Sequence, residues 1–358
     1  MDQPLVLSID AMGGDFGPPV TVEGMALAAR ASRRPLRFLA HGDQTAIEAE
    51  LARFPDLKAK LEIRHTDSVI SGDVKPAQAL RRGKGTSLWN AVESVRAHQA
   101  AGALSGGNTG ALMAISKLHL RMIGGLDRPA IVASWPTSKG MKAVLDVGAN
   151  IDCDADQLLE FAVMGSAFWG AVHGAGKRPT VGLLNVGSEE MKGHQEVRDA
   201  HQILRLGGLD FDYHGFVEGN DIALGTVDVV VTDGFTGNVA LKTGEGMARF
   251  FGGTLRAALS ATIATKLGAL IASSALRSLK ARLDPSTVNG GPLLGLKGTV
   301  VKSHGSADAR GFANAIGVAA DLAASSYADE IARNMDRLVA IKAAATSEPR
   351  GEAQSAEA

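Results

Sequence analysis

The chain has 358 residues, of which 45% are hydrophobic and 21% are charged, and its net charge is −1. A chain of this length forms one large domain or two ordinary ones, and its composition excludes a disordered protein. The balanced charge leaves no basic excess, which argues against nucleic acid as a partner.

The cysteine content and the apolar segments limit the compartment. Cys153 is the only cysteine, so an internal disulfide and a cysteine-built metal site are excluded, as suits a reducing cytoplasm. The first residues, MDQPLVLSIDAMGGD, lack the pattern of a secretory signal, and no apolar stretch is long enough to span a bilayer. We therefore expect a cytoplasmic protein, soluble or bound at a membrane surface, with no metal and no cofactor.

Short apolar strands, each followed by a polar loop, recur along the chain and often lead into helices. In chain order they are PLVLSID with the loop AMGGDFGPP, LRFLAHGD, LEIRHTD, GALSGGNTG, KAVLDVGAN, TVGLLNVGSEE, VDVVVTDGFTGN and GTVVKSHGS. Helices are predicted from about Val20, near Ala46 and after GALSGGNTG. This alternation predicts an α/β fold with a mostly parallel sheet and helices on both faces. We expect one catalytic domain over 1–345 and a disordered polar tail over 346–358.

Two of the predicted loops combine Gly, Asn and Thr at a helix start. They are SGGNTGA, with Gly107, Asn108, Thr109 and Gly110, and TDGFTGN, with Asp233, Thr236, Gly237 and Asn238. Glycines let a ligand approach the backbone closely, and free N–H groups at a helix start attract anions. The alternative is an ordinary turn capped by Asn and Thr. Because ligands of open α/β sheets bind at the carboxyl ends of strands, we expect these loops to line one anion-binding crevice.

Familiar signatures of nucleotide binding and of covalent catalysis are missing from the sequence. There is no G-x-x-x-x-G-K-[ST], and IDAMGGD does not match G-x-G-x-x-G, so a Walker-type ATPase and a standard dinucleotide site are not indicated. G-x-S-x-G and H-E-x-x-H are also missing. The acidic neighbours of Cys153 would raise its pKa and make it a poor nucleophile. This favours direct attack by a bound small nucleophile.

The segment NVGSEEMKGHQE carries the densest set of reactive groups. Lys192 could neutralise an anion and the charge of a transition state, and His194 could move a proton, with Ser188 beside them. The alternative is a solvated helix start with mixed charges. His304 in VKSHGS is a weaker candidate, since a lone histidine is more often structural. Asp10, in the first loop with Asp15, could orient partners or cap a turn.

A basic amphipathic stretch covers residues 249–283. It contains Arg249, Arg256, Lys266, Arg277, Lys280 and Arg282 and no acidic residue, with apolar residues at helical spacing. Such a pattern can lie on an anionic membrane surface, or it can pack as a helix pair at a dimer interface.

Taken together, LSIDAMGGDFGP, LSGGNTGALMA, LDVGAN, NVGSEEMKG, VVTDGFTGNVALK and VVKSHGSADARGFANAI resemble the bacterial phosphate acyltransferases of phospholipid synthesis. The resemblance extends from Val6 to about Ile331. It implies a Rossmann-like α/β/α sandwich similar to the phosphotransacetylase and isopropylmalate dehydrogenase folds. It also implies a homodimer that associates peripherally with membranes.

The implied reaction transfers a fatty acyl group reversibly from acyl-acyl carrier protein to inorganic phosphate. The acyl phosphate would then pass to a membrane glycerol-3-phosphate acyltransferase. The acidic carrier protein could dock on Arg81, Arg82 and Lys84 or on the basic stretch 277–282, through attraction that salt weakens.

With this reaction, the loops are expected to hold phosphate beside Lys192 while its oxygen attacks the thioester. Backbone N–H groups, Asn238 or Lys192 would stabilise the oxyanion. The expected substrate-binding residues are Asp10, Gly13, Gly14, Asp15, Gly107, Asn108, Thr109, Gly110, Asn150, Ser188, Asp233, Thr236, Gly237 and His304.

Three alternatives remain open at this point. A phosphotransacetylase would share the phosphate chemistry and use acyl-coenzyme A. A decarboxylating dehydrogenase of related fold would need an acidic metal cluster and an adenosine site, and the sequence identifies neither. A non-catalytic membrane-surface scaffold would explain residues 249–283 but not the many polar loops.

Overall fold

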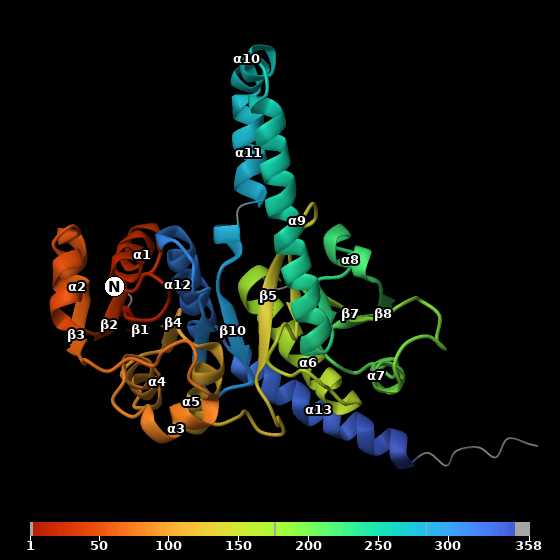
Figure 1. Cartoon of the computed structure of the whole chain (residues 1–358). Coiled ribbons are helices and arrows are strands. Elements are labelled where there is room, and N and C mark those ends of the chain that lie inside the picture. Colours follow the sequence, from red (N-terminus) through yellow and green to blue (C-terminus); the bar gives the residue numbers. More distant parts are fainter. Residues whose placement is uncertain (1–2, 175–176, 284, 348–358) are drawn as a thin grey trace, which may run out of the picture.

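Eleven strands form one sheet that helices cover on both faces in the computed structural model (Figure 1). The structure describes residues 3–174, 177–283 and 285–347, and the side chains of all of these except 280–283, 285, 286 and 347. The α/β/α sandwich predicted from the sequence is confirmed.

The strands are β1 (Leu5–Asp10), β2 (Leu36–Gly42), β3 (Leu61–His65), β4 (Gly102–Ser105), β5 (Ala130–Thr137), β6 (Gly140–Leu145), β7 (Thr180–Leu184), β8 (Asp212–Val217), β9 (Val229–Val231), β10 (Gly291–Leu294) and β11 (Thr299–Lys302). The longer helices are α1 (Pro18–Ala31), α2 (Gln44–Leu51), α3 (Pro76–Arg82), α4 (Ser87–Arg96), α5 (Thr109–Leu120), α6 (Ala155–Trp169), α7 (Gln195–Leu204), α8 (Gly219–Leu224), α9 (Gly234–Ser260), α10 (Ile263–Ile271), α11 (Ser273–Leu283), α12 (Ala309–Ala323) and α13 (Tyr327–Ser347). Short helical turns are η1 (Pro55–Lys60), η2 (Gly170–Gly174) and η3 (Pro285–Val288).

The sheet consists of two parallel halves that run in opposite directions. Its order is β3-β2-β1-β4-β11-β10-β5-β6-β9-β7-β8. Strand β10 is antiparallel to both β11 and β5, and β5 is antiparallel to β6, whereas the pairs within each half are parallel. The carboxyl ends of β1, β4 and β11 therefore lie at one edge of the sheet, and those of β6, β7 and β9 lie at the opposite edge. The predicted loops therefore leave the sheet at two opposite edges, because three antiparallel pairings reverse the direction between the halves.

One apolar core crosses the reversal and joins the two halves. Val300 of β11, Leu293 of β10 and Val144 of β6 pack in the same cluster as Leu112 and Ile115 of α5, and all five are fully buried. Burying a side chain of this kind stabilises the fold by about 1.5–3 kcal/mol. Because this cluster includes residues of both halves, they share a packed interior and are held as one body.

Helix α9 begins against the loop that follows β6. The Asp233 side chain accepts a hydrogen bond from Thr236 N at 2.7 Å and so caps the helix. Gly234 and Gly237 are buried, and a Cβ at Gly237 would overlap the carbonyl oxygen of Asp146. The small residues of TDGFTGN therefore let a helix start pack directly on a neighbouring loop.

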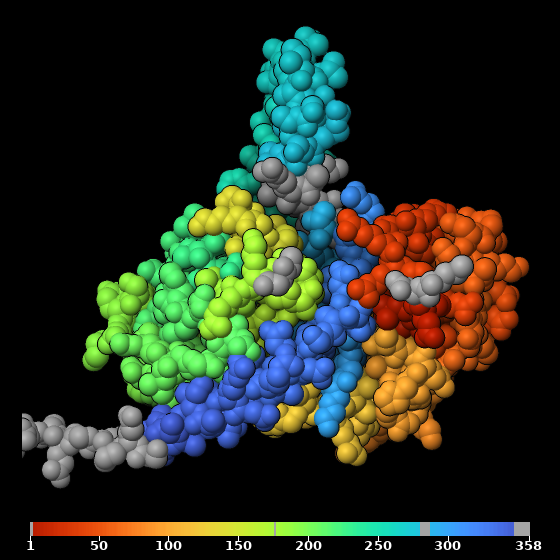
Figure 2. All heavy atoms as spheres, turned by 180° about the vertical axis from the view of Figure 1, so that it is seen from behind, coloured from red at the N-terminus to blue at the C-terminus, as the bar shows by residue number. Residues whose placement is uncertain are grey.

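The predicted amphipathic stretch 249–283 forms the outer part of α9 together with α10 and α11. These helices project from the body as a hairpin (Figures 1 and 2). Its apolar side chains are exposed, with Ile263 at 79% and Ile271 at 87%. The side chains of Lys280 and Arg282 lie outside the described residues. Helix α13 packs on α6 and ends at Ser347, and 348–358 of the expected tail also lie outside the described residues.

Two glycines of α9 provide a matched test of the close approach at its start. Gly237→Ala is expected to lower the free energy of unfolding by about 3 kcal/mol, because the new methyl group must displace the Asp146 backbone. In Gly252→Ala the Cβ would meet no atom within 4 Å, and the better helix former should raise stability by up to about 1 kcal/mol. Urea unfolding of both variants measures the difference. Equal stability of the two variants would contradict this close packing of Gly237 on Asp146.

Candidate functional site

Three strand ends bring Asp10, Ser105 and Lys302 into one row across the sheet. Asp10 of β1 pairs with Ser105 of β4, and Ser105 pairs with Lys302 of β11. Side chains in register on neighbouring parallel strands point to the same face. The Ser105 hydroxyl donates a hydrogen bond to Asp10 Oδ2 at 2.7 Å. Burial raises the pKa of Asp10, and the Ser105 hydrogen bond acts against that shift.

The loops after these strands pack on one another through glycines. A Cβ at Gly13 would lie 2.8 Å from Gly107 N and 2.9 Å from Ser105 Oγ. Gly14 has φ +99°, and the next residue, Asp15, donates its N–H to Gly305 O at 2.8 Å. The sequence assigned these glycines to the approach of a ligand. In the structure they first of all let three loops approach each other.

The loop SGGNTGA caps helix α5. The Asn108 side chain accepts a hydrogen bond from Ala111 N at 2.9 Å and donates to Gly72 O at 2.9 Å and Val74 O at 2.8 Å. Its amide is therefore fully used inside the protein. The N–H groups of Thr109 and Gly110 have no acceptor among the described residues, so they give the helix start the positive end that attracts an anion.

Lys302 lies next to this helix start, and the sequence analysis missed it. Its Nζ donates hydrogen bonds to Gly106 O at 3.2 Å and to Ser303 O. Burial lowers the pKa of Lys302 to about 8, while the charges of Asp10 and Asp15 act in the opposite direction. The available signal was a lysine that directly follows the apolar run TVV.

His304 lies two residues further along and is held as a neutral ring. Its Nδ1 accepts hydrogen bonds from Ser306 N at 3.2 Å and pairs with Ser306 Oγ at 2.9 Å. Burial, followed by the positive charge of Lys242, lowers the pKa of His304. An acceptor role for Nδ1 leaves the proton on Nε2.

A second group of loops surrounds Asp146 in the other half of the sheet. Its fully buried carboxylate accepts hydrogen bonds from the backbone N–H groups of Ile131, Gly148, Ala149 and Asn150. Asn150, a predicted substrate-binding residue, is 4% exposed and donates its Nδ2 to Asp146 Oδ2 and to Pro129 O, both at 2.9 Å. Asn150 therefore shapes this loop from within.

The start of α9 contributes Thr236 and Asn238 to the second group. The Thr236 hydroxyl donates to Asp233 Oδ2 at 2.7 Å, so it completes the cap. Asn238 is exposed and lies against Gly148, with its Oδ1 3.6 Å from where a Gly148 Cβ would stand. Among the described residues its side chain has no hydrogen-bond partner, which leaves it available to a ligand.

The segment NVGSEEMKG forms an exposed loop after β7. Lys192 makes a 2.7 Å ion pair with Glu189, and their side chains are 50% and 60% exposed. Hydrogen bonding to Glu189 raises the pKa of Lys192. Ser188 and His194 are also exposed, and His194 stands just before α7 without capping it through its side chain.

Helix α9 connects the two groups of loops. Asn238 belongs to the second group, and Lys242, one turn later, lies on the same face of the helix. Lys242 is close enough to Lys302 and His304 for its charge to lower the pKa of both. It also forms an ion pair with Glu245 at 3.0 Å. The face of α9 that runs from Asn238 to Lys242 therefore borders both groups.

The Cys153 thiol is held in its protonated form. Burial raises the pKa of the Cys153 thiol to about 12, so a thiolate does not form near neutral pH. Within residues 3–174, 177–283 and 285–347, no group of three His, Cys, Asp or Glu side chains could hold a metal ion. Over the same ranges, no helix has both the length and the apolar character needed to cross a membrane.

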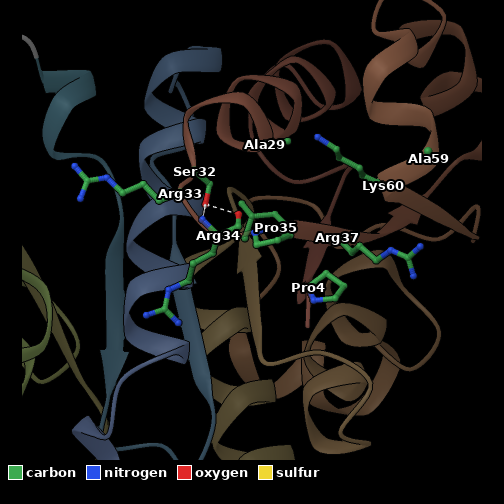
Figure 3. Close-up of a pocket in the computed structure, with 10 residues that line it drawn as sticks. Pro4, Ala29, Ser32, Arg33, Arg34, Pro35, Arg37, Ala59 and Lys60 are labelled. Atoms are coloured by element: carbon green, nitrogen blue, oxygen red, sulfur yellow. Dashed lines mark hydrogen bonds between the residues drawn. The ribbon is translucent and has the colours of Figure 1, made fainter. Parts of the chain in front are cut away.

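A basic hollow lies away from these loops, at the amino-terminal ends of β1 and β2 (Figure 3). It has a volume of about 450 Å³, and its cationic lining residues are Arg33, Arg34, Arg37 and Lys60. The side chains of Arg33 and Arg34 extend to one side and that of Arg37 to the other, so they do not converge on one point. This hollow is therefore not part of the strand-end site.

Comparisons with known proteins agree on fold and family. The family described as "Fatty acid synthesis protein" matches residues 5–330. The phosphate acyltransferase of Caulobacter vibrioides is 65% identical over 97% of this chain and 96% of its own length. The phosphate acyltransferase of Phenylobacterium zucineum is 60% identical over 98% of this chain and 99% of its own length.

Solved structures with similar folds include a phosphotransacetylase from Streptococcus pyogenes. It has a TM-score of 0.61 at 17% identity and covers 89% of this chain and 94% of its own. A branched-chain phosphotransacylase from Enterococcus faecalis has a TM-score of 0.56 at 14% identity. The match covers 89% of this chain and 99% of the E. faecalis chain. At these identities the likeness concerns the fold alone.

The role of the Asn108 side chain can be tested with two substitutions. Asn108→Asp keeps the acceptor for Ala111 N but loses the donors to Gly72 O and Val74 O, whereas Asn108→Ala loses all three bonds. We expect both variants to lose at least about 1 kcal/mol of unfolding free energy. Hydrogen exchange of residues 71–75 should also become faster in both. If Asn108→Asp unfolds with the same free energy as the wild type and its residues 71–75 exchange hydrogen at the same rate, only the hydrogen bond to Ala111 N contributes to stability.

Proposed function

The chain belongs to the fatty acid synthesis protein family, in which its near relatives are phosphate acyltransferases, and on that basis we propose that it transfers a fatty acyl group from acyl-acyl carrier protein to inorganic phosphate. The products are acyl phosphate and free carrier protein, and the acyl phosphate serves phospholipid synthesis. The observation that carries the proposal is the start of α5, where the N–H groups of Thr109 and Gly110 have no acceptor among the described residues, beside Lys302 and Lys242.

Phosphate binds at the start of α5 in this proposal. The free N–H groups of Thr109 and Gly110 donate to its oxygens, and Lys302 and Lys242 balance its charge. Asn108 contributes through the turn that it caps and not through its side chain, which is already hydrogen-bonded. A bound phosphate dianion needs little activation, so its oxygen attacks the thioester carbonyl directly.

The oxyanion that forms on the carbonyl needs donors from a second direction. Asn238 offers an unpaired amide on the face of α9 that borders both groups of loops. Lys192 is a further donor, provided that it leaves Glu189. Both side chains of that ion pair are at least half exposed, and such a pair is worth only about 0–1 kcal/mol. Lys192 can therefore turn toward a substrate at small cost, and His194 lies close by in sequence to assist.

Two rival functions differ in what they predict for the thiol carrier. A phosphotransacetylase would use the same phosphate site with acyl-coenzyme A. Its fold is compatible with this chain, since the S. pyogenes phosphotransacetylase has a similar fold. A non-catalytic scaffold at a membrane surface would use the hairpin alone. It would leave the row of Asp10, Ser105 and Lys302 without a role.

The hairpin of α9, α10 and α11 is proposed to hold the protein at a membrane, near the glycerol-3-phosphate acyltransferase that takes its product. Four exposed apolar residues support this use, namely Ile263, Leu267, Leu270 and Ile271. Pairing with a second subunit to give a homodimer would cover the same kind of surface, and the two uses are compatible.

The acyl transfer is tested with long-chain acyl-acyl carrier protein, with and without phosphate. We expect phosphate-dependent release of carrier thiol and an acyl phosphate that hydroxylamine traps. Lys192→Ala should lower kcat by about a hundredfold to a thousandfold, the usual cost of losing an oxyanion contact. Lys60→Ala, in the hollow of Figure 3, is the matched control and should keep full turnover. Normal turnover in Lys192→Ala would remove Lys192 from the mechanism, and release only from acyl-coenzyme A would favour the phosphotransacetylase.

Membrane association is tested by sedimentation with anionic and with zwitterionic vesicles. The wild type should bind the anionic vesicles. The double variant Leu267→Glu with Ile271→Glu should not bind, because each substitution puts a charge where an apolar side chain would enter the membrane. Val339→Glu, at an exposed apolar residue of α13, is the control. If the hairpin variant still binds vesicles but changes from dimer to monomer in light scattering, the hairpin serves the subunit interface instead.

A further inference from the structure

Lys302 is the most deeply placed amine of the site, and its hydrogen bonds leave one proton unassigned. An ammonium group has three donors. Two of them go to the carbonyl oxygens of Gly106 and Ser303, and the third has no acceptor in the described part of the chain. Gly106 is three residues before the first residue of α5, so the amine is close to the helix start where phosphate is proposed to bind.

The charged groups that face Lys302 come from each element packed around it. Asp10 and Asp15 belong to β1 and its loop, Lys242 belongs to α9, and the neutral ring of His304 lies in the loop that follows β11. The carboxylates favour the charged amine, whereas burial and Lys242 disfavour it. Burial is the largest effect, and it lowers the pKa of Lys302 to about 8. At neutral pH the amine is therefore protonated but can release its proton readily.

The leaving thiolate of the proposed reaction needs a proton donor whose pKa is close to that of a thiol. A thiol has a pKa of about 8.5, and proton transfer is most effective when donor and acceptor have similar pKa values near the working pH. His304 fits this task less well. Its Nδ1 is occupied as an acceptor by Ser306, and its lowered pKa keeps the ring neutral.

We propose that Lys302 carries the proton between phosphate and the leaving thiol. This inference rests on the proposed acyl transfer. Hydrogenphosphate forms its O–C bond to the acyl carbon, the C–S bond breaks, and Nζ of Lys302 gives its proton to the sulfur. The neutral amine then takes the proton of the acyl hydrogenphosphate. The products are acyl phosphate dianion, free thiol and the original ammonium, so the proton returns and charge is conserved.

Two substitutions separate proton transfer from charge. Lys302→Arg keeps a positive charge but holds its proton at every working pH, because the pKa of arginine is above about 12. Lys302→Met keeps the apolar stem and loses both charge and proton. Lys297→Met and Lys297→Arg, at the exposed lysine before β11, are the controls. All variants are compared by urea unfolding, so that a folding defect is detected.

The expected result is a split between kcat and the KM for phosphate. In the wild type, kcat should fall as the pH rises through about 8, where Lys302 loses its proton. Lys302→Arg should lose about a hundredfold or more in kcat, keep the phosphate KM within a small factor, and show no such decline near pH 8. Lys302→Met should show the same loss and a raised phosphate KM as well.

The leaving group supplies an independent readout. An aryl thioester of the same acyl chain releases a thiolate that needs no proton, so the Lys302→Arg defect should shrink at least tenfold. An equal defect for both thioesters, or an arginine variant with wild-type kcat and pH dependence, would overturn the proposal. If the wild type itself forms no acyl phosphate, the proposed function fails instead, and the two failures are thus distinguished.

Discussion

The reversal of strand direction through β10 and β5 determines where each polar loop of this chain lies. If the eleven strands were all parallel, the loops after β1, β4, β6, β9 and β11 would share one edge. Three antiparallel pairings instead divide them into two groups, one around Asp10 and Lys302 and one around Asp146. The common apolar core fixes the position of one group relative to the other, and α9 is the element that reaches both. A site made from both groups therefore depends on this core as much as on its own polar residues.

Within each group, buried polar residues organise the backbone before any ligand is bound. Asp146 gathers the N–H groups of four residues, and Asn108 ties the start of α5 to residues 72–74. Such contacts make the loops rigid, because a buried donor or acceptor that loses its partner costs about 1–3 kcal/mol. Rigid loops hold the remaining free donors, chiefly those of Thr109, Gly110 and Lys302, in fixed positions. Preorganised donors of this kind do not have to reorient when charge develops in a reaction.

Much of the fold and part of the site could be predicted from the sequence. The strands that end at Asp10, Ser105, Leu145, Val231 and Lys302 were recognisable as apolar runs followed by a loop that contains Gly, since this pattern is local. The direction of each strand in the sheet was not, because β11 pairs with β4 across about two hundred residues and β10 is only four residues long. Family resemblance identified the reaction, but it could not say that the Asn108 and Asn150 amides are used internally. Lys302 was missed because a single lysine at the end of a strand looks like an ordinary surface residue until the burial of its neighbours is known.

The length of α9 has a further consequence, since one unbroken helix carries both a border of the site and the base of the projecting hairpin. Lys242 and Ser260 are eighteen residues apart, or about 27 Å along the helix axis. A helix of this length behaves as a stiff spacer. A surface bound at the tip of the hairpin, whether lipid or another protein, would therefore hold the strand-end loops at a fixed distance from it. For the proposed acyl transfer, this spacing would set the distance between the site where acyl phosphate forms and the surface that the hairpin touches.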